Sequence, residues 1–384
     1  MKLSEFMCVF VLCGWCVYIL SYFITSTNVD ILRAADKKSK VLAGQLKDVP
    51  KLGGAHLPSL GFVVIGDFGT GSSLQAQVAT SLGDFVQNAE PPASFVISTG
   101  DQIYDHGLLS ADDPLLISKF EKVWMYVGGV FFVSWRMDAG RRRATLGFYF
   151  DDRVYSIGNH DCEGNIDAML NYAKRTTSLW RFPQRYYNMD HRIDNSTVIR
   201  FLVLDACDLV CGQEPEFKDY RCTAEMDKQT SIVSRRRQYE WIEKVLSMSA
   251  PKSLNDPTQL SRMWTVVVAH WGVYSYAGNG DTPELISNLL PLLDKYDVHA
   301  YFNGHDHALE HVRKGNVQYF TSGAGGYALH KLKPHARAHP ELVHVDMVNG
   351  FMWVEVSHDL FRVQFVDGTN SEILYTTDIP YERA

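Results

Sequence analysis

The sequence has no excess of positive charge, no internal repeat and no low-complexity tract. Its 384 residues carry a formal net charge of −7, so neither a nucleic-acid backbone nor an acidic lipid surface would attract the chain as a whole. This charge argues against a nucleic-acid partner. Apolar residues make up 46% and charged residues 21% of the chain, a composition typical of a folded protein with a sizeable core.

One apolar run is long enough to cross a membrane, and it covers residues 6–25. It is longer than the apolar stretch of most signal peptides, and the following Thr-Ser-Thr is a mediocre cleavage site, so a membrane anchor and a cleaved signal peptide both stay open. Basic residues between 33 and 40 favour a cytosolic location for the rest of the chain, against the lumenal location expected below. The predicted parts are residues 1–27 as signal peptide or membrane anchor, 28–60 as a linker and 61–384 as one folded domain.

Cysteine is sparse in the rest of the chain. Three of the seven cysteines lie in the apolar run and four lie outside it. Cys211 and Cys222 bracket a polar stretch that a disulfide would fix in place, although free buried thiols fit the sequence equally well. Asn195, followed by Ser-Thr, is an acceptor for N-glycosylation if its loop enters the secretory lumen. These features favour the secretory pathway.

The apolar pattern predicts strands that alternate with helices. Helical spacing is expected over 74–86 and 239–246, and after the capping residues Asp112 and Asp113. Beyond Gly315, β-prone runs separated by turns predict antiparallel strands. This order indicates a layered α/β domain. The other expected strands cover residues 62–65, 95–97, 154–157, 198–204, 264–268 and 298–302.

Side chains that bind metals follow five of the apolar runs, at the point where each expected strand ends. Loops from different parts of a chain converge at the carboxyl ends of strands in an open α/β sheet. Carboxylate, phenol, amide and imidazole groups in this number suffice for two metal ions, so the pattern predicts metal-assisted hydrolysis. The segments are Gly-Asp-Phe-Gly (Asp67), Gly-Asp-Gln-Ile-Tyr (Asp101, Tyr104), Gly-Asn-His-Asp (Asn159, His160, Asp161), Val-Val-Ala-His (His270) and Gly-His-Asp-His (His305, His307).

The order of these segments resembles the purple acid phosphatases, within the calcineurin-like metallophosphoesterases, in their small tartrate-resistant form. The resemblance covers the chain from about Gly61 to the C-terminus. It implies an α/β fold, a four-layer sandwich of two packed mixed β-sheets flanked by helices. It also implies an acid phosphatase that hydrolyses phosphate monoesters, and we expect a monomeric glycoprotein that is lumenal, secreted or membrane-anchored.

The resemblance further implies a set of ligands for a binuclear centre. A tyrosine phenolate suits a hard ferric ion and gives the purple family its colour, so the first metal is expected to be Fe(III). The second metal would be Fe(II), Zn(II) or Mn(II). The implied ligands are Asp67, Tyr104 and His307 for the first metal, Asp101 as the bridge, and Asn159, His270 and His305 for the second metal.

The mechanism implied by this pairing is attack of a metal-bound hydroxide on the phosphate, with an acidic optimum because Fe(III) is a strong Lewis acid. His160, beside the ligand Asn159, is the candidate proton donor to the leaving alkoxide. Asp161 would either support the His160 imidazole or cap the loop.

The sequence departs from the family pattern in two places. The resembling phosphatases carry a second histidine near the substrate phosphate, and the matching stretch of this chain has Asn279, which can donate a hydrogen bond but cannot act as an acid. We therefore count Asn279 among the catalytic candidates and expect slower turnover or a shifted pH profile. His106 would either compensate, from another loop, for the missing second histidine or have an ordinary surface role. The second departure is the stretch 127–147, where the resemblance implies a shorter connection; a surface insertion, a partner-binding loop and an artefact of the gene model all stay open.

Two other functions stay open. A non-catalytic membrane anchor or scaffold on a phosphatase fold is disfavoured by the complete set of ligands. A phosphodiesterase or nucleotidase is disfavoured by Tyr104, because other members of the superfamily lack a tyrosine at this point.

Overall fold

The computed structural model describes residues 58–125, 133–138, 141–146, 152–175, 180–212 and 222–381. The predicted signal peptide or anchor and nearly all of the predicted linker lie outside these ranges. Among the helices that are described, none is both long and apolar enough to cross a membrane.

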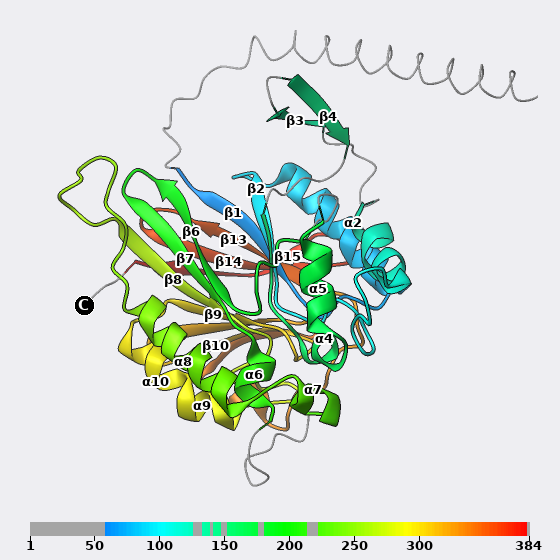
Figure 1. Ribbon diagram of the computed structural model, residues 1–384. Helices are drawn as coiled ribbons and strands as arrows, with labels where there is room; N and C mark the ends of the chain where they lie inside the picture. The colour runs from blue at the N-terminus through cyan, green and yellow to red at the C-terminus, as the bar shows by residue number, and fades with distance from the viewer. Residues whose placement is uncertain are drawn as a thin grey trace, which may run out of the picture. The chain divides into compact units, whose positions relative to one another are not determined.

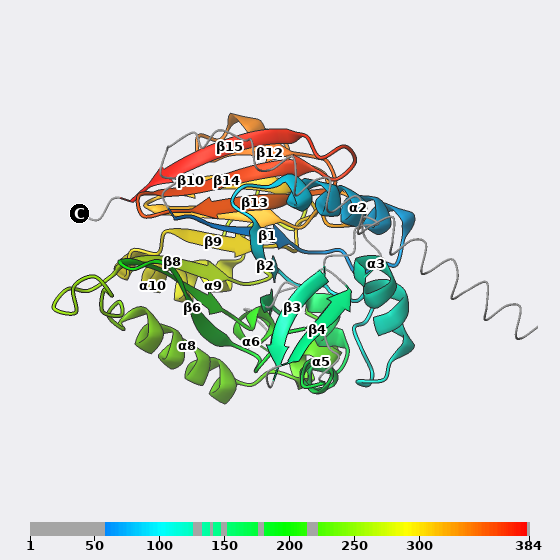
Figure 2. The same cartoon turned by 90° about the horizontal axis from the view of Figure 1, so that it is seen from above.

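The first of two large sheets combines strands from both ends of the domain. Its order is β15-β14-β13-β1-β2-β5, with β1, β2 and β5 parallel and β13 antiparallel to β1. Figure 2 shows the C-terminal strands beside β1, although they are far apart in sequence. The strands are β1 (Leu60–Ile65), β2 (Ala93–Ser98), β5 (Asp152–Tyr155), β13 (Gly350–Val356), β14 (Leu360–Asp367) and β15 (Ile373–Pro380).

The second large sheet has seven strands in the order β12-β10-β11-β9-β8-β7-β6. Its centre, β7, β8, β9 and β11, is parallel, and its outer strands are antiparallel to their neighbours. Beyond Gly315, where antiparallel strands were expected, β11 pairs antiparallel with β10 but in parallel with β9. The strands are β6 (Tyr187–Asp194), β7 (Thr197–Val203), β8 (Arg262–Val268), β9 (Ala300–Asn303), β10 (Leu309–Lys314), β11 (Val317–Ser322) and β12 (Leu342–Asp346).

Aromatic side chains join the two sheets face to face. The ring of Phe62 in β1 stacks on Phe95 at 4.9 Å and meets the edge of Phe201 in β7 at 5.5 Å. At the other end of the interface, Trp264 in β8 lies 5.5 Å from Phe361 in β14. All five rings are buried, and burial of such large apolar surfaces drives the sheets together. The predicted pair of packed mixed sheets is confirmed.

Helices cover both sheets (Figure 1). The helix α2 (Ser73–Asn88) begins at Ser72, whose side chain accepts from the Gln75 amide, and its Phe85 packs on Phe351 of the first sheet. Helices α8 (Ile232–Leu246), α9 (Pro283–Asn288) and α10 (Leu290–Lys295) contribute buried residues to the core beside the second sheet. The helix expected after Asp112 begins as a π-helical turn, Leu116–Glu121, followed by α3 (Lys122–Met125).

Shorter elements complete the described chain. The stretch 127–147 contains the strands β3 (Val133–Asp138) and β4 (Arg141–Leu146), which pair antiparallel as a separate two-stranded sheet. The remainder of that stretch lies outside the described residues. The short helices are α4 (Asn159–Glu163), α5 (Ile166–Ala173), α6 (Ala206–Val210), α7 (Ala224–Lys228) and the 3-10 turn Ala336–Ala338.

Candidate metal centre

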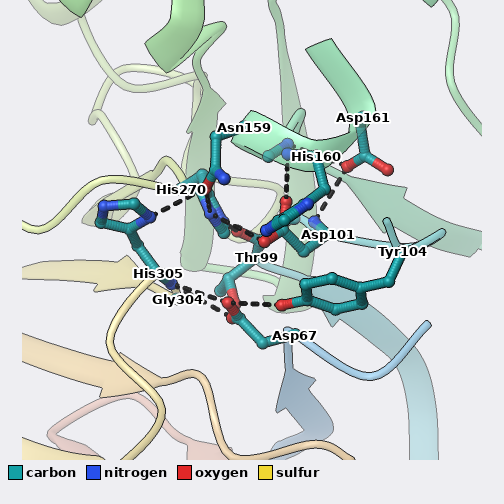
Figure 3. Close-up of polar contacts among 12 residues, drawn as sticks. Asp67, Thr99, Asp101, Tyr104, Asn159, His160, Asp161, His270, Gly304 and His305 are labelled. Atoms are coloured by element: carbon teal, nitrogen blue, oxygen red, sulfur yellow. Dashed lines mark hydrogen bonds and ion pairs between the residues drawn. The ribbon is translucent and has the colours of Figure 1, made fainter. Parts of the chain in front are cut away.

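The carboxyl ends of strands from both sheets meet at one edge of the sandwich, where all five predicted polar segments lie. The Asp67 amide donates to the Gly100 carbonyl at 3.0 Å, which joins the ends of β1 and β2. The Gly304 amide donates to the His270 carbonyl at 3.1 Å, which joins the ends of β9 and β8. Figure 3 shows the side chains from these segments pointing toward one another. The structure therefore brings the five predicted segments together.

The backbone at this edge adopts conformations that side chains usually avoid. Asp67, Asp101 and His305 have φ angles of 56°, 56° and 68°, in the left-handed region that is uncommon for residues other than glycine. Such conformations concentrate at functional sites, where the surrounding structure holds them. The nearby glycines leave room for the ligands, because a Cβ on Gly158 would lie 2.0 Å from Asp101 Oδ1, and one on Gly304 would lie 2.2 Å from Asp67 Oδ2.

One half of the cluster joins a phenol, a carboxylate and an imidazole. The Tyr104 hydroxyl donates to Asp67 Oδ1 at 3.3 Å and lies 3.3 Å from His307 Nε2. Asp67 Oδ1 and His307 Nε2 are themselves 3.5 Å apart. All three side chains are at least nine-tenths buried. These three atoms therefore face one small volume, as ligands of one ion must.

The other half is built around an amide oxygen. Asn159 Oδ1 lies 2.9 Å from His270 Nε2 and 2.9 Å from His305 Nδ1. Asp101 Oδ2 lies 3.4 Å from His270 Nε2, and ligand atoms of Asp67, Asp101 and His270 all lie within 4.8 Å of one another. Asp101 thus connects the two halves of the cluster, as expected of a bridging carboxylate.

Backbone carbonyls fix the orientation of two imidazoles. His270 Nδ1 lies 2.8 Å from the Thr99 carbonyl, and His307 Nδ1 lies 2.6 Å from the Ala328 carbonyl. A carbonyl only accepts, so each Nδ1 carries the proton and donates it. Each Nε2 is then left to face the cluster with its lone pair, which is the usual arrangement around a metal-binding histidine.

The buried carboxylates and histidines of the cluster shift one another's pKa values. Burial raises the pKa of Asp67. It also raises the pKa of Tyr104, far above the usual value of a tyrosine. Burial opposes ionisation of Asp101 as well, but the attraction of His270 outweighs it and lowers the pKa of Asp101. Asp101 and Asp67 in turn overcome burial and raise the pKa of His270 to about 9. The carboxylates recruit positive charge, which is the compensation that a metal cation supplies.

The donor set therefore fits a pair of metal ions. Oxygen donors predominate around Asp67 and Tyr104, which suits a hard ion, and imidazole nitrogens predominate around Asn159, which suits a divalent transition metal. The geometry and charge of the described residues agree with this assignment, and the roles of the individual ligands are proposed below.

His160 lies at the mouth of the cluster. Its backbone amide donates to Asp101 Oδ1 at 3.0 Å, and its ring lies 4.4 Å from the ring of Tyr104. Its Nδ1 donates to the carbonyl of Asp105, which leaves Nε2 as the nitrogen available to a bound molecule. The half-buried side chain is thus both close to the ligands and accessible.

The carboxylate of Asp161 is fully buried and bonds to the backbone. It accepts from the amides of Asp101 at 2.9 Å, Gln102 at 3.1 Å and Gly158 at 2.9 Å. These contacts fix the loop that carries Asp101 to the start of α4, which carries Asn159. Of the two roles considered for Asp161, its contacts support the capping of the loop.

Asn279 and His106 also make contacts of their own. The side-chain amide of Asn279 donates to the His305 carbonyl at 2.8 Å, and its backbone amide donates to Asp306 Oδ1 at 2.7 Å. Asn279 thus lies beside a predicted ligand and braces its backbone. The side chain of His106 is 80% exposed and pairs with Glu163 at 2.5 Å, which supports the surface role.

Two features beside the site had no clear sequence signal. The imidazole of His330 stacks on His307 at 4.0 Å, and its Nδ1 lies 3.0 Å from Asp306 Oδ1. Tyr327 stacks on Tyr104 at 4.5 Å. Both residues lie in the loop after β11, which contains no strand-end motif.

Two disulfides hold the chain near the site. The sequence left a disulfide and free thiols equally open for Cys211 and Cys222, and the structure has the disulfide, with a Cα–Cα distance of 5.5 Å. A second bond, between Cys162 and Cys207, was not predicted. Because Cys162 lies in α4, this bond ties the helix that carries Asn159 and His160 to α6.

A family model described as calcineurin-like phosphoesterase matches residues 60–309, and the chain therefore belongs to the calcineurin-like phosphoesterases, whose members use a binuclear metal centre. Within this family it is related to the purple acid phosphatases. Purple acid phosphatase 3 of Arabidopsis thaliana is 30% identical over 315 residues, which cover 80% of this chain and 75% of that protein. Tartrate-resistant acid phosphatase type 5 of Homo sapiens is 27% identical over 344 residues, which cover 86% and 94% respectively.

Among solved structures, GAP50, described as the anchor in the inner membrane complex of Plasmodium, is similar with a TM-score of 0.65 at 19% identity. The match covers 85% of this chain and 90% of that chain. At this identity the likeness shows the fold alone.

Proposed function

We propose that the protein is an acid phosphatase that hydrolyses phosphate monoesters at a binuclear Fe(III)–M(II) centre, where M is iron, zinc or manganese. The observation that carries the proposal is the position of the Tyr104 hydroxyl, 3.3 Å from both Asp67 Oδ1 and His307 Nε2. A phenol in this position distinguishes the purple acid phosphatases from phosphoesterases whose sites contain only carboxylates, amides and imidazoles. The two acid phosphatases named above support the same activity.

The proposed ligands follow the two halves of the cluster. When bound, the two cations would hold the phosphate oxygens, lower the pKa of a water and stabilise charge in an in-line displacement. The proposed ligands are Asp67, Tyr104 and His307 for Fe(III), Asp101 for both ions, and Asn159, His270 and His305 for the divalent ion.

The chain's own residues would handle the leaving group. Hydrolysis forms a bond between a water oxygen and phosphorus and breaks the ester P–O bond, so the departing alkoxide needs a proton. His160 can supply it from Nε2, because its Nδ1 is held by the Asp105 carbonyl and its ring stands at the mouth of the cluster. Asp161 acts indirectly, since it fixes the loop of Asp101. Asn279 would contribute a hydrogen bond but no proton.

The secretory pathway is the proposed location. Two disulfides are stable in an oxidising compartment, and Asn195 of the acceptor sequence is exposed in the turn between β6 and β7. The apolar run at residues 6–25 would deliver the chain to that compartment as a signal peptide or hold it there as an anchor.

An activity assay across pH tests the proposal. The iron-loaded full chain should release p-nitrophenol from p-nitrophenyl phosphate with an acidic optimum, and Asp67→Asn should abolish this activity because it removes a ligand charge. The matched control is Asp84→Asn, an exposed residue on α2, which should behave as the wild type. A metal-replete wild type that is inert from pH 4 to 8 would refute the proposal.

A second candidate is a membrane anchor without catalysis, and the fold of GAP50 together with the apolar N-terminal run favours it. The same assay separates the two functions. An anchor should bind iron weakly or not at all. It should release no p-nitrophenol, with or without the Asp67→Asn substitution.

A further inference from the structure

The loop between β11 and β12 carries a concentration of positive charge next to the metal centre. Residues 330–339, which we name the basic loop, contain two lysines, one arginine and three histidines and no acidic residue, in a chain whose net charge is −7. The lysines and the arginine are Lys331, Lys333 and Arg337. All three are exposed, and within the part of the chain that the structure describes no carboxylate lies within 4.0 Å of their charged groups.

Apolar and polar contacts hold the basic loop in place. Leu332 packs on a small cluster formed by Ala277, Ala308 and Val345, so that the lysines on either side of it are directed away from that cluster. The Arg337 guanidinium donates to the carbonyl of Val345 in the edge strand β12 at 3.4 Å. The exposed cations are therefore presented by a fixed loop, which reduces the entropy lost when they bind an anion.

Two contacts connect the basic loop to the metal centre. At its start, His330 stacks on the predicted ligand His307 and reaches Asp306. In its middle, the ammonium of Lys333 lies over Gly280, since a Cβ on Gly280 would lie 1.7 Å from Lys333 Nζ. Gly280 follows Asn279, whose side chain bonds to the backbone of the ligand His305. Lys333 thus stands next to Asn279, which adjoins the predicted ligand His305.

A shallow cavity of about 470 Å³ lies in the same loop. Its lining includes Lys333, His335 and Arg337, with Leu332 and two alanines between them. Lysine and arginine side chains without a carboxylate partner can bind phosphate or carboxylate groups through charge-assisted hydrogen bonds.

We propose that the basic loop is a second anion subsite, and that the preferred substrates are phosphate monoesters carrying a further phosphate or carboxylate. This inference rests on the proposed function, because it places the scissile phosphate at the metal centre and the second anionic group on Lys333 and Arg337. The resulting selectivity is electrostatic and falls with added salt, since both cations are exposed.

Matched substrate pairs test the subsite in the metal-replete full chain. The pairs are fructose 1,6-bisphosphate against fructose 6-phosphate, for a second phosphate, and 2-phosphoglycerate against glycerol 2-phosphate, for a carboxylate. We expect the substrate with the additional anionic group to have the higher kcat/KM at low salt in at least one pair. The pair that shows this preference tells whether the subsite binds a phosphate or a carboxylate. No preference in either pair would overturn the proposal.

Variants then assign the preference to the loop. Replacing two charge-assisted contacts should cost about tenfold each, so Lys333→Gln/Arg337→Gln should reduce the preference at least tenfold. The control Arg237→Gln/Lys244→Gln removes the same charge from exposed residues of α8 and should leave the preference intact. An equal loss in both double variants would attribute the effect to net charge and refute the subsite.

A binding measurement separates the subsite from the proposed activity. Methylenebisphosphonate cannot be hydrolysed, and calorimetry should show it bound about tenfold or more weakly by Lys333→Gln/Arg337→Gln than by the wild type and the control. If no ester is hydrolysed but this difference persists, the proposed function fails and the subsite stands. If esters are hydrolysed and the difference is absent, the subsite fails alone.

Discussion

The disulfide between Cys162 and Cys207 should matter more to this protein than the one between Cys211 and Cys222. It joins residues 45 apart in sequence, and the other joins residues 11 apart. The loop-entropy relation gives about 4 kcal/mol of stabilisation for the longer loop and about 3 kcal/mol for the shorter one at 25 °C. The longer link also holds α4, which carries Asn159 and His160, against α6.

The two double variants Cys162→Ala/Cys207→Ala and Cys211→Ala/Cys222→Ala are matched probes of this difference. Urea unfolding of the metal-free full chain, followed by tryptophan fluorescence, should show losses of stability near the two values above. Iron content after dialysis should fall in the first variant, because Asn159 is no longer held in place, and stay at the wild-type level in the second. A loss below about 1 kcal/mol in the first variant, or equal iron loss in both, would refute this reasoning.

Three further predictions concern single residues. His160→Asn should lower kcat by about 10²-fold for glycerol 2-phosphate, whose alkoxide needs a proton, and much less for p-nitrophenyl phosphate, whose leaving group does not; equal losses would contradict its role as donor. Asn279→His should alter turnover or the pH profile with p-nitrophenyl phosphate, and an unchanged enzyme would show that this position has no catalytic importance. Burial lowers the pKa of His311 to about 4, below the value near 6.5 of an unfolded chain, so its contribution to stability is present above pH 6.5 and is lost as the pH falls toward 4. Urea unfolding should show a loss of about 2 kcal/mol between pH 7 and 5 from this residue, and His311→Gln should flatten that part of the profile; an identical profile would contradict the assignment.

Strands such as β1 and β7 could be predicted from sequence because their largely apolar runs are short and buried. The sequence 62–65 belongs to β1, and 198–204 corresponds to β7, whose residues are all buried. The strands β6, β10 and β12 were not predicted, because they lie at or near a sheet edge and mix charged with apolar residues. Their charged residues interrupt the continuous apolar runs from which the other strands were predicted.

The candidate site was predicted to the extent that its residues follow strand ends. The seven predicted ligands share that feature, and the structure brings all of them together. Asp161 could not be assigned, because its role depends on which backbone amides face it. His330 and the pairing of Cys162 with Cys207 depend on contacts between segments that are distant in sequence, and no local pattern reports such contacts.

The most direct test of the central claim is the visible absorption spectrum of the iron-loaded full chain and of Tyr104→Phe. The wild type should show an intense charge-transfer band from a phenolate bound to Fe(III), because the Tyr104 oxygen faces Asp67 and His307. Tyr104→Phe should lose that band, with the iron content of both proteins measured to normalise the spectra. A wild type that binds iron without the band, or a variant that keeps it, would contradict the account.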